Sequence, residues 1–138
     1  MPDIAMGALT QNGTVLLARR GSKRKAHPNR WSLPGGHIEN GEDAETTMCR
    51  ELMEEIGVNP EHWQFVGRFV SESPPEASAT FHVYHVDKWR GCPRLIDDEH
   101  TELRWFTAAA IGFEAELALP QLAEMLGNLA MHRRAESA

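Results

Sequence analysis

The chain has 138 residues, of which 41% are hydrophobic and 25% are charged, and its formal net charge is −6. These proportions are typical of globular domains and argue against wholesale disorder, collagen and a coiled coil. No apolar run approaches the roughly 20 residues that a membrane helix requires, and residues 1–10 lack the basic start of a signal peptide. We therefore expect one soluble domain over residues 1–138, located in the cytoplasm, with Cys49 and Cys92 as reduced thiols.

The first part of the chain predicts a hairpin, a loop and a short strand. Residues 4–10 and 14–19 are expected to be strands, because an Asn-Gly turn signal separates them. Residues 21–29 are basic and rich in turn formers, which is typical of a loop. A short strand at residues 31–33 then leads into two glycines, where the backbone must turn tightly or approach another group closely.

A helix is predicted next, between Asp43, a good N-cap residue, and Gly57, which is typical just past a helix end. Its residues Leu52, Met53 and Ile56 share one arc at helical spacing, so we expect them to face the core.

The remainder of the chain predicts strands followed by a helix. Three segments alternate or cluster apolar residues as strands do: residues 62–70, 79–89 and 103–106. Residues 119–132 place leucines and a methionine at helical spacing. Strands before, between and after two helices predict an α/β fold, with a mixed sheet covered on both faces.

The helix after the glycines carries three carboxylates on one face. Glu51, Glu54 and Glu55 are spaced i, i+3 and i+4, and no lysine is interleaved among them. Hard divalent cations prefer oxygen ligands, and Mg²⁺ commonly combines one or two carboxylates with phosphate oxygens and water. This face therefore predicts a metal site, and a solvated acidic face is the alternative.

A longer motif surrounds these three residues and decides between the two interpretations. It reads Gly36-x5-Glu42-x7-Arg50-Glu51-Leu52-x-Glu54-Glu55-x-Gly57-Val58. This segment resembles the Nudix box at every defined position. Seven positions are fixed residue types used at roughly 5–7% each, so a chance match at one start is on the order of 10⁻⁹. The preceding residues 31–36 also resemble the approach to the box in MutT-type members.

The resemblance implies a Nudix hydrolase with an α/β/α sandwich fold, in which a mixed β-sheet lies between helices. Such an enzyme hydrolyses a nucleoside diphosphate linked to another group X. For this chain, the resemblance favours hydrolysis of a (deoxy)nucleoside triphosphate to the monophosphate and pyrophosphate by metal-activated water. It implies Mg²⁺ as the cofactor, with Mn²⁺ as a substitute, and a nucleotide as the partner. No nucleic acid polymer and no membrane are expected, and a homodimer is left open.

The resemblance also implies roles for individual residues. It assigns metal binding to Glu51, Glu54, Glu55 and the carbonyl of Gly35. It places Glu42 and Arg50 in support, because Arg50 can pair with a neighbouring carboxylate and fix its orientation. Bound metals would neutralise the phosphate oxygens and lower the pKa of a bound water.

The reaction also needs a general base. Family members place this base in the box or on a loop before the last strand, so the candidates are Glu51, Glu54 and Glu99. Counting back from the last strand selects Glu99, whereas counting forward from the preceding strand selects Asp97. A solvated acidic loop is the alternative for Glu99.

Three residues are candidates for binding substrate. Arg19 and Arg20 follow the second strand, where MutT-type members often carry basic residues. Neighbouring side chains on a strand point in opposite directions, so we expect one of the two to contact phosphate or base. His37 follows the glycines and could hydrogen-bond the substrate, or it could lie on the surface.

Two alternatives to this substrate and function remain open. ADP-ribose or another nucleotide sugar is the alternative substrate, because members of that group carry a proline near the position of Pro74 or Pro75. A catalytically silent nucleotide-binding module is the alternative function, although such modules usually lose box carboxylates.

The chain departs from MutT proper at one position that reads the base. MutT proper reads an oxidised guanine with an asparagine before its last helix, where this chain has residues 117–120, Leu-Ala-Leu-Pro.

Overall fold

The computed structural model describes residues 1–113 and 115–137, with side chains described up to residue 131. The strands are β1 (Asp3–Gln11), β2 (Thr14–Arg20), β3 (Trp31–Ser32), β4 (Gly35–His37), β5 (Asn59–Ser71), β6 (Ala79–Arg90) and β7 (His100–Thr107). The helices are α1 (Ala44–Ile56), α2 (Ala108–Phe113) and α3 (Leu122–Ser137), with a short 3₁₀ helix at Pro75–Ala77. None of the described helices is both long enough and apolar enough to cross a membrane.

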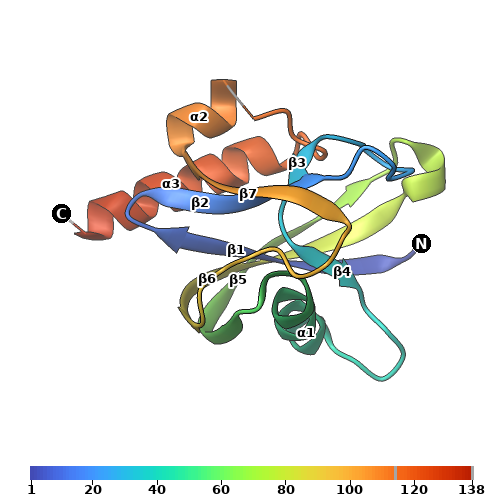
Figure 1. The fold of residues 1–138 in the computed structure, drawn as a ribbon, viewed down its shortest axis with the longest axis horizontal. Coiled ribbons are helices and arrows are strands. Elements are labelled where there is room, and N and C mark those ends of the chain that lie inside the picture. Colours follow the sequence, from blue (N-terminus) through green and yellow to red (C-terminus); the bar gives the residue numbers. More distant parts are fainter. Residues whose placement is uncertain (114, 138) are drawn as a thin grey trace.

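The strands form one mixed sheet. The main order is β3-β2-β1-β6-β5, with β4 paired to β1 and β7 paired to β2. Strands β1 and β6 are parallel, and the other pairs are antiparallel. Figure 1 shows α1 on one side of β1 and α3 on the other. This arrangement confirms the predicted α/β/α sandwich.

Two cores explain why the sheet is covered on both sides. Successive side chains of a strand point to opposite faces. Accordingly, Ala5 and Leu9 of β1 pack with buried residues of α1, whereas Met6 and Ala8 pack with buried residues of α3. Strand β1 therefore has to be apolar on both faces, and its central residues 5–10 are all buried.

The turn and helix-capping residues act as predicted. Asn12 and Gly13 both have positive φ angles, of 50° and 77°, as a tight hairpin turn requires. The Asp43 carboxylate accepts a hydrogen bond from the Thr46 N–H over 2.8 Å, and this contact caps the start of α1. Gly57, at φ 70°, ends the helix.

One face of α1 differs from the prediction. Leu52 and Ile56 are buried, but Met53 is 46% exposed, so its expected place in the core is wrong. Glu55 is buried instead, with 4% of its surface exposed. The buried arc of the helix is therefore rotated towards the carboxylates, and one of them lies inside the protein.

Candidate active site

Two glycines allow β4 to lie against both β1 and α1. A Cβ atom on Gly35 would lie 2.2 Å from the carbonyl oxygen of Ala5, so only glycine permits this pairing. A Cβ atom on Gly36 would lie 2.4 Å from the carboxyl carbon of Glu51. The space that a side chain would occupy is therefore filled by a carboxylate from the helix.

Glu55 is the most buried carboxylate of the box. It accepts a hydrogen bond from the backbone N–H of Gly35 over 2.9 Å. Burial, followed by the nearby charges of Glu51 and Asp97, raises the pKa of Glu55 to about 9. A cation bound here would offset both causes, because it would supply the opposite charge in a place where water cannot.

The chain after β6 brings a second acidic group to this place. The N–H groups of Arg94 and Ile96 donate to the carbonyl oxygens of Ile56 and Glu55 over 3.1 and 3.0 Å. Carbonyl groups in the last turn of a helix lack intrahelical donors, so they are free to hold this segment. The next residue, Asp97, is thereby placed beside Glu55.

Glu55, Asp97 and His100 form a cluster with metal-ligand chemistry. One ligand atom from each residue lies within 4.8 Å of the others. The Nδ1 atom of His100 lies 3.4 Å from Oδ1 of Asp97 and 3.7 Å from Oε1 of Glu55. The second carboxylate oxygen of Asp97 is buried and has no hydrogen-bond partner among the described residues. Buried polar atoms are nearly always paired, so this oxygen fits a site that a cation completes.

The other box carboxylates border the same hollow. Its volume is about 260 Å³, and acidic residues line it: Glu51, Glu54, Glu55, Asp97, Asp98 and Glu99. The side chain of Glu51 is 17% exposed and that of Glu54 is 58% exposed. Such a concentration of carboxylate oxygens suits a hard divalent cation.

Arg50 organises the carboxylates on one side of this hollow. Its guanidinium donates to Glu42 over 2.7 Å, to Glu51 over 3.0 Å and to Glu54 over 3.3 Å. Hydrogen bonds from Arg50 and Thr47 lower the pKa of Glu42 to about 2. Glu42 therefore stays charged and anchors Arg50, and Arg50 in turn orients the two box glutamates.

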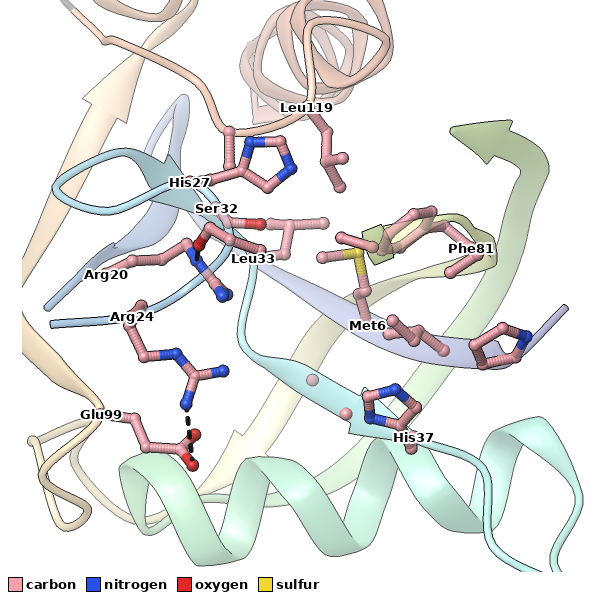
Figure 2. Close-up of a pocket in the computed structure, with 18 of the residues that line it drawn as sticks. Met6, Arg20, Arg24, His27, Ser32, Leu33, His37, Phe81, Glu99 and Leu119 are labelled. Atoms are coloured by element: carbon pink, nitrogen blue, oxygen red, sulfur yellow. Dashed lines mark hydrogen bonds and ion pairs between the residues drawn. The ribbon is translucent and has the colours of Figure 1, made fainter. Parts of the chain in front are cut away.

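A larger cavity of about 500 Å³ adjoins the acidic hollow, and both are lined by Glu51, Glu55 and Glu99. Figure 2 shows that arginines and apolar side chains occupy different parts of this cavity. Arg24 lies beside Glu99 and Arg20 lies beyond Arg24, whereas Met6, Phe81 and Leu119 lie on the other side of the cavity, with Leu33 between the two groups. Burial, followed by the charge of Arg24, lowers the pKa of Arg20 from its ordinary value.

The structure separates the two neighbouring arginines of β2. Arg20 lines the cavity, and its Nε donates to the carbonyl oxygen of Ala26 over 2.9 Å. Arg19 is not among the lining residues, and its Nε donates to the carbonyl oxygen of Asn29 instead. His37 lines the cavity as well. Substrate binding by these residues stays a prediction.

Sequence reasoning missed Arg24. It lies in the basic loop between β2 and β3, and it lines the cavity, whereas the neighbouring lysines do not. Its Nη1 lies 3.1 Å from Oε1 of Glu99. The sequence left open whether Glu99 or Asp97 is the loop residue of the site, and the structure shows where each of them lies. Asp97 is the member of the loop beside Glu55, and Glu99 faces both the acidic hollow and Arg24.

The NUDIX domain model matches residues 1–128. The chain belongs to the NUDIX family. The 8-oxo-dGTP diphosphatase of Escherichia coli is 35% identical over 93 residues, which cover 66% of this chain and 70% of that protein. The RNA pyrophosphohydrolase of Caulobacter vibrioides is 32% identical over 122 residues, covering 86% of this chain and 62% of that protein.

Solved structures agree with this assignment. A MutT NUDIX hydrolase from Burkholderia pseudomallei is 26% identical, with a TM-score of 0.74 and 96% of each chain covered. A MutT protein from Methanosarcina mazei has a TM-score of 0.78 at 22% identity, over 95% of this chain and 93% of that one, and supports the fold. The family match and the named relatives confirm the predicted Nudix pyrophosphohydrolase, and a catalytically silent module is not favoured.

Proposed function

We propose that this Nudix hydrolase splits a nucleoside triphosphate into the monophosphate and pyrophosphate with Mg²⁺ as its cofactor. One observation carries the proposal: the apolar end, the two arginines and the acidic hollow follow one another along adjoining cavities. A nucleoside triphosphate has the matching order of base, sugar and phosphates.

The arginines and the acidic hollow together address the charge of the substrate. A net charge of −6 would repel a polyphosphate. Arg20 and Arg24 provide local positive charge where the cavity meets the hollow, and arginine is well suited to phosphate oxygens. The adjoining carboxylates would hold the cation that accompanies the phosphates.

Glu51, Glu54 and Glu55 would hold Mg²⁺, together with the Gly35 carbonyl and Asp97. The cation would supply neutralisation of phosphate oxygens and a lowered pKa for the attacking water. The box glutamates would be held in position by Arg50, which already donates to Glu51 and Glu54.

The proton of the attacking water needs an acceptor at the acidic hollow. Glu51, Glu54 and Glu99 are the proposed candidates, because each of them lines the hollow. Glu55 is less suited to this task, since its burial favours the protonated form in the absence of a cation.

The apolar end of the cavity would receive the base. Phe81 and Leu119 face this region together with Met6, and Ser32 adds one hydroxyl. A hydrogen bond from the Ala118 N–H to the Trp31 carbonyl holds the segment that presents Leu119. No asparagine or glutamine is among the described lining residues, so an oxidised guanine would have to be read by other groups.

A panel of nucleotides with product analysis tests the proposal. It includes canonical and oxidised triphosphates, ADP-ribose, sugar nucleotides, dinucleoside polyphosphates and an RNA bearing a 5′-triphosphate. We expect a free nucleoside triphosphate to yield pyrophosphate with the highest kcat/KM. Preferred hydrolysis of ADP-ribose or of the RNA would contradict this choice of substrate, and no hydrolysis of any member would contradict the function.

A further inference from the structure

Arg24 lies where the larger cavity meets the acidic hollow. It lines the larger cavity, and its ion-pair partner Glu99 lines both spaces. Figure 2 shows the Arg24 guanidinium reaching from the β2–β3 loop towards Glu99, beside α1. A phosphate chain that runs from the arginines to the box carboxylates would pass this ion pair.

A backbone hydrogen bond holds the loops of Arg24 and Glu99 together, but the ion pair between their side chains can still be broken. The N–H of Gly21 donates to the carbonyl oxygen of Glu99 over 2.9 Å, which holds the two loops together. The side chains are 37% and 50% exposed, and their closest atoms are 3.1 Å apart. An ion pair exposed to this degree contributes little net stability, so a stronger anion can replace the carboxylate.

A polyphosphate is such an anion. It offers several charged oxygens to a guanidinium whose planar donors match phosphate geometry. Once Arg24 has turned to phosphate, Glu99 is left without its cation on the rim of the hollow that also holds Glu51 and Glu55. Its carboxylate is then available to the metal or to the attacking water.

We propose that Arg24 is a positioning residue that exchanges partners during the reaction, binding Glu99 in the free enzyme and the polyphosphate in the complex. This inference rests on the proposed function. It makes arrival of the substrate the event that releases Glu99. The free enzyme thereby avoids an additional unpaired carboxylate in a hollow that is already acidic.

Arg24→Ala tests the exchange, with Lys25→Ala as the matched control. Lys25 belongs to the same loop and carries the same charge, but it is exposed and does not line the cavity. Mn²⁺ binding to the nucleotide-free protein is measured by calorimetry, and KM is measured with the best triphosphate of the panel. A change in charge alone would affect both variants equally.

The two measurements are expected to move in opposite directions for Arg24→Ala. Mn²⁺ should bind about two- to fivefold more tightly, because the competing cation on Glu99 is gone. KM should rise about 10- to 100-fold, because a charged hydrogen-bond donor to phosphate is lost. Lys25→Ala should alter neither value, and Arg24→Lys should restore part of both.

Glu99→Gln identifies the carboxylate involved. In a Glu99→Gln background, adding Arg24→Ala should no longer tighten Mn²⁺ binding. Unchanged or weaker Mn²⁺ binding by Arg24→Ala alone, or equal behaviour of the Arg24 and Lys25 variants, would overturn this inference. A wild-type protein that hydrolyses no nucleotide would overturn the proposed function as well, so the two failures are distinguishable.

Discussion

The backbone N–H of Gly35 donates a hydrogen bond to Oε2 of Glu55 over 2.9 Å. This contact joins β4, which is held against β1, to the helix that carries the box carboxylates. The direction of a main-chain N–H is fixed by the strand, so this donor sets the orientation of the buried Glu55 carboxylate although Gly35 has no side chain. The same carboxylate meets Asp97 and His100 on its other side, which makes Glu55 the centre of the candidate metal site.

We expect activity to require a divalent cation and to disappear in excess EDTA. The reason is a buried oxygen of Asp97 beside Glu55 that has no hydrogen-bond partner within the described part of the chain and that a bound cation would pair. Mg²⁺ should also raise the Tm, because a ligand that binds only the folded state adds about 2.7 kcal/mol at 100 times its Kd. Ca²⁺ and Mg²⁺ titrations followed by calorimetry check the expected rise in Tm. Full turnover in EDTA would refute the requirement for a cation.

The metal-free protein should lose stability from Glu55 as the pH rises. The pKa of this carboxyl is about 9 in the folded protein, against an ordinary value of 4.5, so the folded state keeps a proton that the unfolded chain releases. The contribution is fully present below pH 4.5 and is lost as the pH rises through 9. In EDTA, the Tm of Glu55→Gln should therefore rise relative to wild type between pH 5 and pH 9.

Glu54→Gln is the control for this comparison, because its side chain is 58% exposed. It makes the same substitution at an exposed site, so the comparison separates the effect of burial from the effect of replacing Glu by Gln. A flat difference for Glu55→Gln would mean that the buried carboxyl is not protonated in the folded, metal-free protein.

The box carboxylates should matter for turnover much more than for folding. Glu54→Gln keeps the shape of the side chain but removes a charge at the hollow, and we expect kcat to fall by about 10²–10³-fold. Arg50→Ala should cost about 10- to 100-fold, because it acts by orienting Glu51 and Glu54. Circular dichroism should show both variants folded. Wild-type kcat in Glu54→Gln would show that its assigned role is wrong.

The acidic loop offers a comparison of three neighbouring residues. Asp97→Asn should weaken Mn²⁺ binding, because Asp97 is the loop residue beside Glu55. Glu99→Gln should lower kcat by about 10²-fold, the usual effect of a positioned acid–base group, with little effect on nucleotide binding. Asp98→Asn should be nearly neutral and serves as the control. If Asp97 and Glu99 were both dispensable, the base would have to lie in the box, at Glu51 or Glu54.

The sequence by itself determined the local parts of this protein. The Asn-Gly turn, the Asp43 cap and the Gly57 stop depend on residues a few positions apart, and each forms as predicted. The spacing of the box glutamates along one helix is equally local. For this reason the family, the helix and its three carboxylates follow from the order of the residues alone.

Only the tertiary structure decided which side chains complete the site. Met53 is exposed against expectation and Glu55 is buried, because neighbouring strands, not helical spacing alone, set the rotation of α1. Asp97 lies beside Glu55 because a distant segment hydrogen-bonds to the end of that helix. The conformation of the β2–β3 loop places Arg24 in the lining of the cavity and leaves Lys25 outside it. These relationships join residues tens of positions apart, and such distances are fixed by packing, which no local spacing encodes.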